Sequence, residues 1–260
     1  MDETDRKLQQ KHLEILAING GVILEKPFYM YASGEIGPHE IHADAVSKNG
    51  KDFKEAITDM RRAIELETYG GTEGIDVISG GESRDWIFSF SVAEQMGLAP
   101  AMIYKDGRYF GPNLQNKNVV HVADLSDEGS SPRDLWVPAI RKRGGVIEQI
   151  FFYVDRMEEG PRVMEKLGLE SHALVYLDEN AWNYLLEKRF ISKEKHKMVL
   201  DRGTTKEQRD AWAIKMLRSD KGKERLRQLY NDPKEHEKVK KVISHYKELT
   251  DELKEAVNKV

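Results

Sequence analysis

The 260-residue sequence has no cysteine, only 8 prolines and no apolar stretch long enough to cross a membrane. The lack of cysteine excludes disulfides, thiolate metal sites and cysteine nucleophiles. Residues 1–5 are acidic and lack the basic and apolar segments of a secretion signal. We therefore expect a soluble, cytoplasmic protein that does not contact a membrane.

The sequence also lacks a large excess of one sign of charge, since its formal net charge is only −4. This balance gives no reason to expect general nucleic-acid binding. A hydrophobic share of 39% is enough to build a core and excludes a wholly disordered chain. Residues 201–260 hold 16 basic and 12 acidic residues, whereas the first 200 hold 25 and 33. This shift predicts two domains, residues 1–195 and a helical appendage at 196–260.

Strand and helix patterns alternate in the middle of the chain. The predicted strands are 77–78, 101–104, 119–123, 146–154 and 173–177. The predicted helices between them are 85–96 and 132–143, the second with Ser131 as its N-cap. Short links between alternating strands and helices predict βαβ units on a parallel sheet.

The flanking regions follow other patterns. Helices are predicted at residues 5–19 and 53–66, each followed by a glycine pair, Gly20-Gly21 and Gly70-Gly71. Between them lies a strand-rich stretch, 28–46, and a loop is predicted at 106–118. The last 60 residues have almost no strand signal. Asp232-Pro233 predicts the start of a helix with an apolar stripe to Val257, after one or two shorter helices.

Residues 124–131, Asp-Leu-Ser-Asp-Glu-Gly-Ser-Ser, link the buried strand 119–123 to a helix. A loop that enters a helix N-terminus from the end of a parallel strand can bind phosphate through free N–H groups. Gly129 permits close backbone approach, and Asp124 can accept hydrogen bonds from sugar hydroxyls. An ordinary acidic loop that caps a helix has the same pattern, so the residues alone leave both interpretations open.

The stretch 119–131 resembles the phosphoribosyl-diphosphate loop of type I phosphoribosyltransferases. Four further features follow in the family's order and fit its orotate phosphoribosyltransferase branch best. They are the turn Ser33-Gly34-Glu35-Ile36-Gly37-Pro38, the loop Gly80-Gly81-Glu82-Ser83-Arg84, the pair Tyr104-Lys105, and Val154-Asp155-Arg156 with Gly160 and Leu167-Gly168-Leu169. The resemblance covers roughly residues 10–185. It implies an α/β, parallel-sheet type I phosphoribosyltransferase-like fold with a C-terminal helical extension.

The resemblance also implies an activity. The family joins a nitrogenous base, here orotate or a similar one, to the ribose of phosphoribosyl diphosphate and releases pyrophosphate. Mg²⁺ is the implied cofactor, held by the diphosphate rather than by protein ligands, and a homodimer is the implied assembly. The transition state resembles an oxocarbenium ion, so catalysis depends on positioning and on stabilising the charge of the leaving group.

The same resemblance assigns residues to roles. Asp124 would hold the ribose hydroxyls, while Lys105 and Arg84 would supply positive charge to the pyrophosphate. Arg156 would pair with the carboxylate of an orotate-like base, a task suited to a planar guanidinium. The remaining implied binding residues are Gly81, Glu82 and Ser83 at the pyrophosphate and Ser126, Asp127, Glu128, Gly129, Ser130 and Ser131 at the 5′-phosphate.

Several residues depart from the family pattern. Ala123 stands where the first of two adjacent acids is usual, and Asp127 and Glu128 place carboxylates beside a phosphate site. Each close pair of like charges costs about 1 kcal/mol or more. A catalytically inactive protein that binds a nucleotide or phosphorylated sugar is therefore the second hypothesis. RNA binding by the basic tail is disfavoured, because acidic residues are interleaved with its basic ones.

Overall fold

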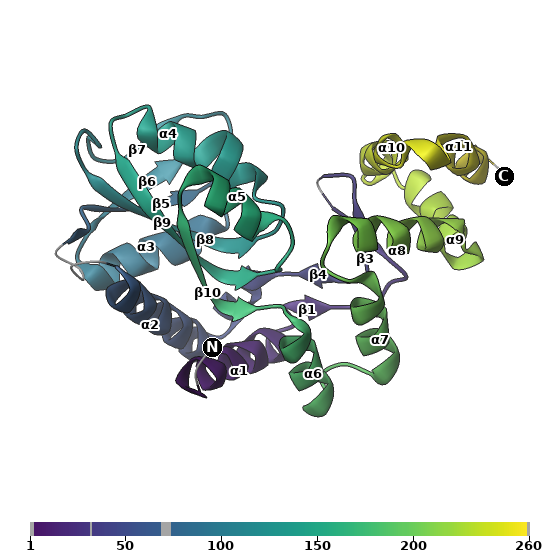
Figure 1. Ribbon diagram of the computed structural model, residues 1–260, viewed down its shortest axis with the longest axis horizontal. Helices are drawn as coiled ribbons and strands as arrows, with labels where there is room; N and C mark the ends of the chain where they lie inside the picture. The colour runs from purple at the N-terminus through teal and green to yellow at the C-terminus, as the bar shows by residue number, and fades with distance from the viewer. Residues whose placement is uncertain (1–2, 32, 69–73, 259–260) are drawn as a thin grey trace. The chain divides into compact units, whose positions relative to one another are not determined.

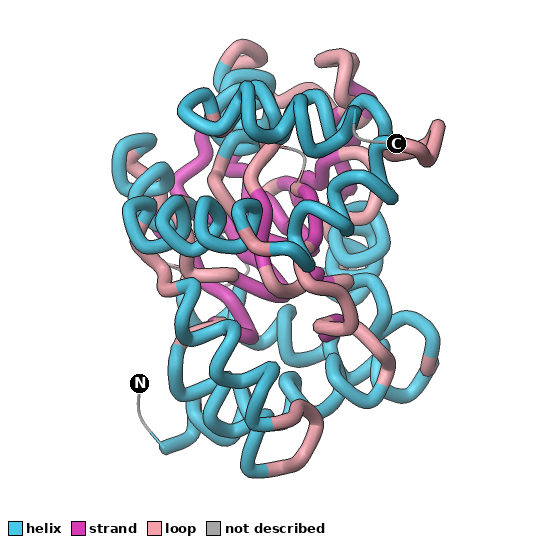
Figure 2. The backbone as a smooth tube through the Cα atoms, turned by 90° about the vertical axis from the view of Figure 1, so that its right-hand side faces the viewer, coloured by secondary structure: helices cyan, strands magenta, loops and turns pink. Residues whose placement is uncertain are grey.

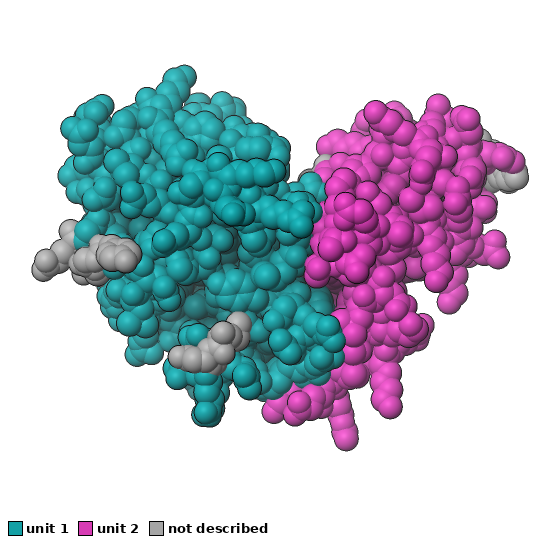
Figure 3. Space-filling view, in the orientation of Figure 1, with its two compact units in different colours: residues 1–21, 42–185 teal, residues 22–41, 186–260 magenta. Residues whose placement is uncertain are grey.

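The computed structural model describes residues 3–31, 33–68 and 74–258 (Figure 1). The chain divides into two compact units, coloured separately in Figure 3. Unit 1 comprises residues 1–21 and 42–185, and unit 2 comprises residues 22–41 and 186–260. This division differs from a single boundary near residue 195, because the segment 22–41 groups with the C-terminal helices. The helix end expected at Gly70-Gly71 lies outside the described residues.

Unit 1 is built on a six-stranded sheet with the order β10-β9-β8-β5-β6-β7. Its strands are β5 (Val77–Gly81), β6 (Ala99–Ile103), β7 (Tyr109–Phe110), β8 (Asn118–Ser126), β9 (Val146–Asp155) and β10 (Glu170–Tyr176). All neighbours pair in parallel except β6 and β7. The predicted α/β fold with a parallel sheet is confirmed. The loop prediction for 106–118 missed β7, because a two-residue strand has no detectable periodicity.

Helices cover both faces of this sheet (Figures 1 and 2). On one face, Phe88 of α3 stacks on Tyr153 of β9 with ring centroids 5.3 Å apart, and His12 of α1 contacts the same tyrosine. The preceding residue of β9, Phe152, faces the opposite side because side chains alternate along a strand. The helices of unit 1 are α1 (Glu3–Ile18), α2 (Gly50–Glu67), α3 (Asp85–Met96), η3 (Pro132–Trp136), α4 (Val137–Arg141) and α5 (Gly160–Leu167).

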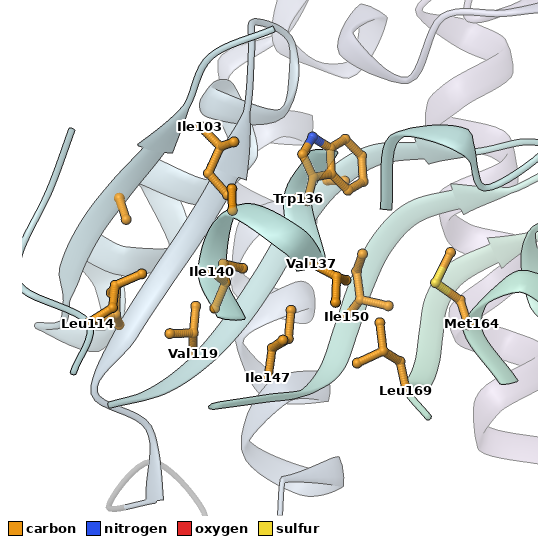
Figure 4. Packing of buried hydrophobic residues seen from close by; sticks show 14 of the residues in the cluster. Ile103, Leu114, Val119, Trp136, Val137, Ile140, Ile147, Ile150, Met164 and Leu169 are labelled. Atoms are coloured by element: carbon orange, nitrogen blue, oxygen red, sulfur yellow. The ribbon is translucent and has the colours of Figure 1, made fainter. Parts of the chain in front are cut away.

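The face that carries Phe152 holds the apolar cluster shown in Figure 4. Trp136, Val137 and Ile140 from η3 and α4 pack there against Ile150 of β9 and Met164 of α5. Full burial of side chains of this size stabilises the fold by about 1.5–3 kcal/mol each. The cluster therefore anchors the segment that follows β8 and with it the loop 124–131.

Two boundaries in unit 1, at Ser131 and at residue 43, differ from the sequence predictions. Ser131 has helical dihedral angles and makes no capping hydrogen bond, because the helical run already begins at Ser130. The stretch that was predicted to be strand-rich up to residue 46 ends in the 3₁₀-helix η1 (Ala43–Lys48). Among the described residues, no helix is both long enough and apolar enough to cross a membrane.

Unit 2 consists of short strands and helices with a core of its own. Strand β1 (Val22–Ile23) pairs with β4 (Glu40–Ile41), and β2 (Tyr29–Met30) pairs with β3 (Ile36–Gly37). Phe28 and Ile36 pack among the C-terminal helices. The helices that follow residue 178 are α6 (Glu179–Glu187), α7 (Lys193–Arg202), α8 (Lys206–Arg218), α9 (Asp220–Tyr230), α10 (His236–His245), η4 (Lys247–Leu249) and α11 (Thr250–Asn258).

The C-terminal helical extension is confirmed. Within it, the helix that Asp232-Pro233 was predicted to start begins later. The Asp232 carboxylate accepts the N–H of Lys234, and helix α10 begins only at His236. Asp232 thus forms a turn rather than a helix cap, since both conformations use the same side-chain acceptor. The apolar stripe to Val257 is divided between α10 and α11.

Candidate functional site

The strand order reverses between β5 and β8, and we call the region at the carboxyl ends of these two strands the crevice. From β5 the chain moves to β6 on one side, and then it returns to β8 on the other side of β5. Ligands of open α/β sheets bind at the carboxyl ends of strands where the order reverses in this way. β5 and β8 pair from Val77 with Val119 to Ser79 with His121. The segments 80–84 and 124–131 begin in the last residues of these strands, because β5 continues to Gly81 and β8, which was predicted to end at residue 123, continues to Ser126.

The loop after β5 is closely packed and braced from the neighbouring strand. A side chain on Gly81 would place a Cβ atom 2.3 Å from Trp136 Nε1 and 2.6 Å from Asp85 Oδ2, so only glycine fits. The Glu82 carboxylate accepts the backbone N–H of Lys105 at 2.9 Å. Glu82 therefore joins this loop to the end of β6, while Lys105 itself is exposed.

Asp124 belongs to the last part of β8. It is 6% exposed, and its Oδ2 atom is 3.2 Å from Nε of the half-exposed Arg84. Burial raises the pKa of the Asp124 carboxyl group, and the nearby positive charge of Arg84 opposes that shift. Arg84 also lies 3.8 Å from the Asp44 carboxylate. Three residues distant in the sequence thus meet in one charged group.

Asp85, the first residue of α3, is a further buried acid in this group. Its two carboxylate oxygens accept the N–H groups of Gly81 and Asp124 at 3.1 and 3.0 Å. Burial, and next the Asp124 charge, raise the pKa of Asp85 well above its usual range. Sequence reasoning missed Asp85 and Asp44. An acid in the first turn of a helix is common, because it interacts favourably with the helix dipole, so Asp85 gave no distinct signal.

The loop after β8 is held by the start of α5. Gly160 N–H donates to the Asp127 carbonyl at 2.8 Å, and a Cβ on Gly129 would lie 2.8 Å from Val163 Cβ. Gly129 has φ +70°, so glycine is favoured there for its backbone as well. The Asp127 side chain accepts the N–H of Glu128 at 2.7 Å, which places a carboxylate on one of the loop's own amides.

A helical run begins at Ser130, directly after this loop, and continues to Arg141. The first N–H groups of a helix have no partner within the helix, and its dipole favours an anion there. Ser130, Ser131 and Gly129 therefore lie where the amides of a phosphate-binding loop are expected.

Arg156, at the end of β9, lies beside the same loop but is paired. Its N–H donates to the Ser126 carbonyl at 3.0 Å, and its guanidinium group donates to Glu158 Oε1 at 2.7 Å. Both side chains are nearly inaccessible, at 5% and 2% exposure. Burial raises the pKa of the preceding residue, Asp155, to about 6. Arg156 and Glu158 thus form a buried ion pair.

The crevice offers carboxylate oxygens of the kind that Mg²⁺ prefers. Asp124 and Asp44 flank Arg84, and Mg²⁺ is usually bound by one or two carboxylates together with substrate phosphates. These residues fit a metal ion held mainly by a diphosphate.

In unit 2, the described residues include a cluster of three potential ligands, Glu35, Asp210 and His245. Arg209 Nε lies 3.3 Å from the Glu35 carboxylate, so a cation already occupies that position.

Comparisons with known proteins agree with this geometry. The chain is 29% identical over 153 residues to orotate phosphoribosyltransferase of Rhizobium meliloti, covering 55% of this chain and 65% of the relative. It is 26% identical over 180 residues to the Staphylothermus marinus enzyme of that name, covering 66% and 83%. The resemblance to orotate phosphoribosyltransferases that the sequence motifs indicate is thus confirmed. It spans about two thirds of the length of the rhizobial relative. No family model matches the chain.

Solved structures support the phosphoribosyltransferase fold. Orotate phosphoribosyltransferase from Aeropyrum pernix superposes with a TM-score of 0.57 at 17% identity, covering 68% of this chain and 98% of that one. The Mycobacterium tuberculosis enzyme in complex with 5-phospho-α-D-ribosyl 1-diphosphate gives 0.51 at 17% identity, covering 65% and 96%. At these identities the likeness establishes the fold alone.

Proposed function

We propose that this phosphoribosyltransferase-fold chain binds phosphoribosyl diphosphate in the crevice between β5 and β8 and transfers its phosphoribosyl group to a nitrogenous base. The observation that carries the proposal is the ion pair between Arg84 and Asp124, 3.2 Å apart at the switch point of the sheet. An anion-binding group and a sugar-binding group are thereby adjacent. The helix N-terminus after Gly129 supplies the third part, a place for the 5′-phosphate.

In the proposed reaction the bond between ribose C1 and the diphosphate oxygen breaks, and its electron pair leaves with pyrophosphate. The base nitrogen forms the new bond to C1, and the proton of that nitrogen passes to solvent. The ribose hydroxyls replace Arg84 as partners of the Asp124 carboxylate. Arg84 then turns to the diphosphate, where the exposed Lys105 adds a second positive charge. Mg²⁺, bound through the diphosphate, would supply further charge neutralisation. Stabilising the departing pyrophosphate in this way lowers the barrier of an oxocarbenium-like transition state.

Orotate is the base that the relatives' names suggest, and Arg156 is the residue proposed to bind its carboxylate. To do so, Arg156 must exchange its buried partner Glu158 for the substrate. A base without a carboxylate does not require that exchange. The variant Arg156→Ala separates the two cases, since it reduces turnover with orotate and leaves turnover with uracil unaffected.

The test is product formation by the purified chain with phosphoribosyl diphosphate, Mg²⁺ and each common base in turn. Phosphoribosylation of any of the bases, abolished in Asp124→Asn, supports the transferase. Absence of turnover with every base excludes it. Calorimetry with the same diphosphate in the absence of a base shows whether the crevice binds it, and ligand binding to the folded chain also raises the melting temperature.

A second candidate is a protein that binds a phosphorylated ribose without chemistry. The specific observation in its favour is Asp127, whose carboxylate accepts the Glu128 amide within the proposed phosphate loop. A bound phosphate has to displace this carboxylate or coexist with it against Coulomb repulsion. Binding of a nucleotide without turnover, and tighter binding by Asp127→Asn, support this candidate.

We also propose a homodimer, which light scattering of the purified chain tests directly. A mass of twice the 29.9 kDa of the chain supports the proposal, and the mass of a single chain excludes it.

A further inference from the structure

The two loops of the crevice are joined by the carboxyl group of Asp85. One of its oxygens accepts the N–H of Gly81 at the end of β5. The other accepts the N–H of Asp124 in the adjacent strand β8. The pairing of these two strands ends at Ser79 and His121, and Asp85 connects them beyond that point.

The surroundings leave Asp85 little freedom to move. Asp85 is only 5% exposed. A Cβ atom added to Gly81 would lie 2.6 Å from the Oδ2 atom of Asp85. The Trp136 indole closes the other side of Gly81, at 2.3 Å from the same Cβ position. The carboxyl group therefore fixes the spacing of two backbone segments rather than filling a flexible pocket.

The charges around Asp85 indicate what this spacing controls. Burial and the adjacent Asp124 charge raise the pKa of Asp85. Arg84 faces Asp124 from the loop after β5, and Asp44 faces Arg84 from η1. The spacing that Asp85 fixes therefore affects how Arg84 and Asp124 face each other.

We propose that Asp85 is a positioning residue that sets the distance between the loop 80–84 and Asp124, and thereby the affinity of the crevice for a ribose that bears a diphosphate. The inference rests on the proposed function for its ligand. Its structural part, the link between the two strand ends, does not depend on any ligand.

The chain offers a matched control at the opposite end of the same two strands. Asp76 directly precedes β5, and its carboxylate accepts the N–H of Asn118, the first residue of β8, at 2.8 Å. It also accepts a hydrogen bond from Lys117 Nζ at 2.7 Å. Asp76 thus bridges the same pair of strands far from their carboxyl ends. A purely structural role for Asp85 would make the two acids equivalent.

The experiment compares Asp85→Ala, Asp85→Asn and Asp76→Ala in the full chain. Affinity for phosphoribosyl diphosphate with Mg²⁺ is measured by calorimetry, and unfolding is followed by temperature. We expect Asp85→Ala to weaken binding by about 30-fold, because two oriented amides and the Asp124 carboxylate lose their support. Asp85→Asn keeps one of the two acceptors, while its NH2 group faces the other backbone N–H, and we therefore expect it to restore binding only in part.

Asp76→Ala is expected to lower the melting temperature and to leave the affinity unchanged. The proposal is overturned if Asp85→Ala binds as tightly as the wild type. It is also overturned if Asp76→Ala loses as much affinity as Asp85→Ala, because the loss then reflects general loosening of the sheet.

Amide hydrogen exchange separates failure of this inference from failure of the proposed function. In Asp85→Ala, the N–H groups of Gly81 and Asp124 should exchange about tenfold faster or more, because their acceptors are gone. A wild-type chain that binds no phosphoribosyl diphosphate refutes the function and the affinity claim, while faster exchange still confirms the link between the strand ends. Unchanged exchange at both amides refutes the link itself, whatever the ligand.

Discussion

Each unit of the molecule contains a buried carboxylate among charged neighbours, but the balance of charge differs between them. In unit 2, Glu35 is 4% exposed and lies within 4 Å of Arg209, Arg202 and Lys206. In unit 1, the buried Asp85 lies against another buried acid, Asp124, which has Arg84 as its cationic partner. Glu35 therefore has three basic side chains around one carboxylate, whereas the crevice has two buried carboxyl groups, Asp85 and Asp124, beside one arginine.

This difference separates a structural centre from a functional one. A buried charge that has several opposite charges around it serves the fold, since removing a partner leaves it uncompensated. Carboxyl groups with raised pKa values cluster at functional sites, because ligand binding there can use the imbalance. We therefore expect substitutions in unit 2 to change stability and substitutions in the crevice to change binding.

The largest effect is expected for Arg209→Met in unit 2. The variant leaves Glu35 without its nearest partner, at a cost of about 3 kcal/mol in the free energy of unfolding. Chemical denaturation measures this loss, and calorimetry should show unchanged affinity for phosphoribosyl diphosphate. The control is Arg218→Met, whose exposed pair with Glu252 contributes less than about 1 kcal/mol. Equal losses in both variants would contradict the structural role of the Glu35 centre.

Asp124→Asn should have the next largest effect, on function alone. Loss of the carboxylate that holds the ribose should lower kcat/KM, or affinity if the chain only binds, by about 100-fold. The free energy of unfolding should not fall by more than about 0.5 kcal/mol. The reason is that burial raises the pKa of this carboxyl group, so its charge is less favourable in the folded chain than in the unfolded chain. A variant that unfolds but retains its affinity would reverse the comparison.

A smaller effect is expected from pH, through His121 beneath the crevice. Burial lowers the pKa of this histidine to about 3, while Ser79 Oγ lies 2.9 Å from its Nδ1 atom. The unfolded chain binds a proton at His121 below about pH 6.5 that the folded chain does not bind. Stability is therefore complete above that pH and falls as the pH approaches 3. In His121→Phe, whose ring can still stack on Trp136, urea unfolding at pH 7 and pH 5 should show a smaller decrease. An unchanged decrease would assign the pH dependence to other groups.

The smallest effect is expected for Lys105→Ala. The side chain is exposed, so its interaction with a diphosphate is screened by salt. Affinity should fall about threefold at low ionic strength, and the difference should vanish at about 1 M salt. Arg108→Ala is the control, because Asp106 already pairs with that guanidinium group at 2.7 Å. A loss for Lys105→Ala that persists at high salt would indicate a direct, desolvated contact.

The fold of unit 1 was predictable because its pattern is local. Apolar runs such as 119–123 and glycine-ended helices such as 85–96 repeat along the chain, and each maps onto one element. The division into units was not predictable in the same way. The segment 22–41 joins the C-terminal helices through contacts such as the 3.2 Å hydrogen bond from Ile36 N–H to Tyr246 Oη. Such a contact spans more than 200 residues and has no local pattern.

The candidate site was predictable only as a set of loops. Motif order placed Arg84 and Asp124 in one crevice, and the structure brings them into contact. Asp85 was missed because its role depends on where two strands part. The pairing of Arg156 with Glu158 depends on burial, which the sequence of that loop does not reveal. The roles of the individual residues stay predictions until the binding measurements are made.

The insertion of residues 22–41 has a consequence for how the chain is made. Its two ends are close together, since His42 N–H donates to the carbonyl of Gly21 at 2.9 Å. Unit 1 can therefore fold as soon as residue 185 has left the ribosome, before residues 22–41 have their partners. The loop carries Phe28 and Ile36, whose apolar partners lie in helices that are translated last. A nascent chain that is stalled before residue 206 would thus leave Phe28 and Ile36 exposed. Chaperones that bind exposed apolar segments should recognise the chain at that stage.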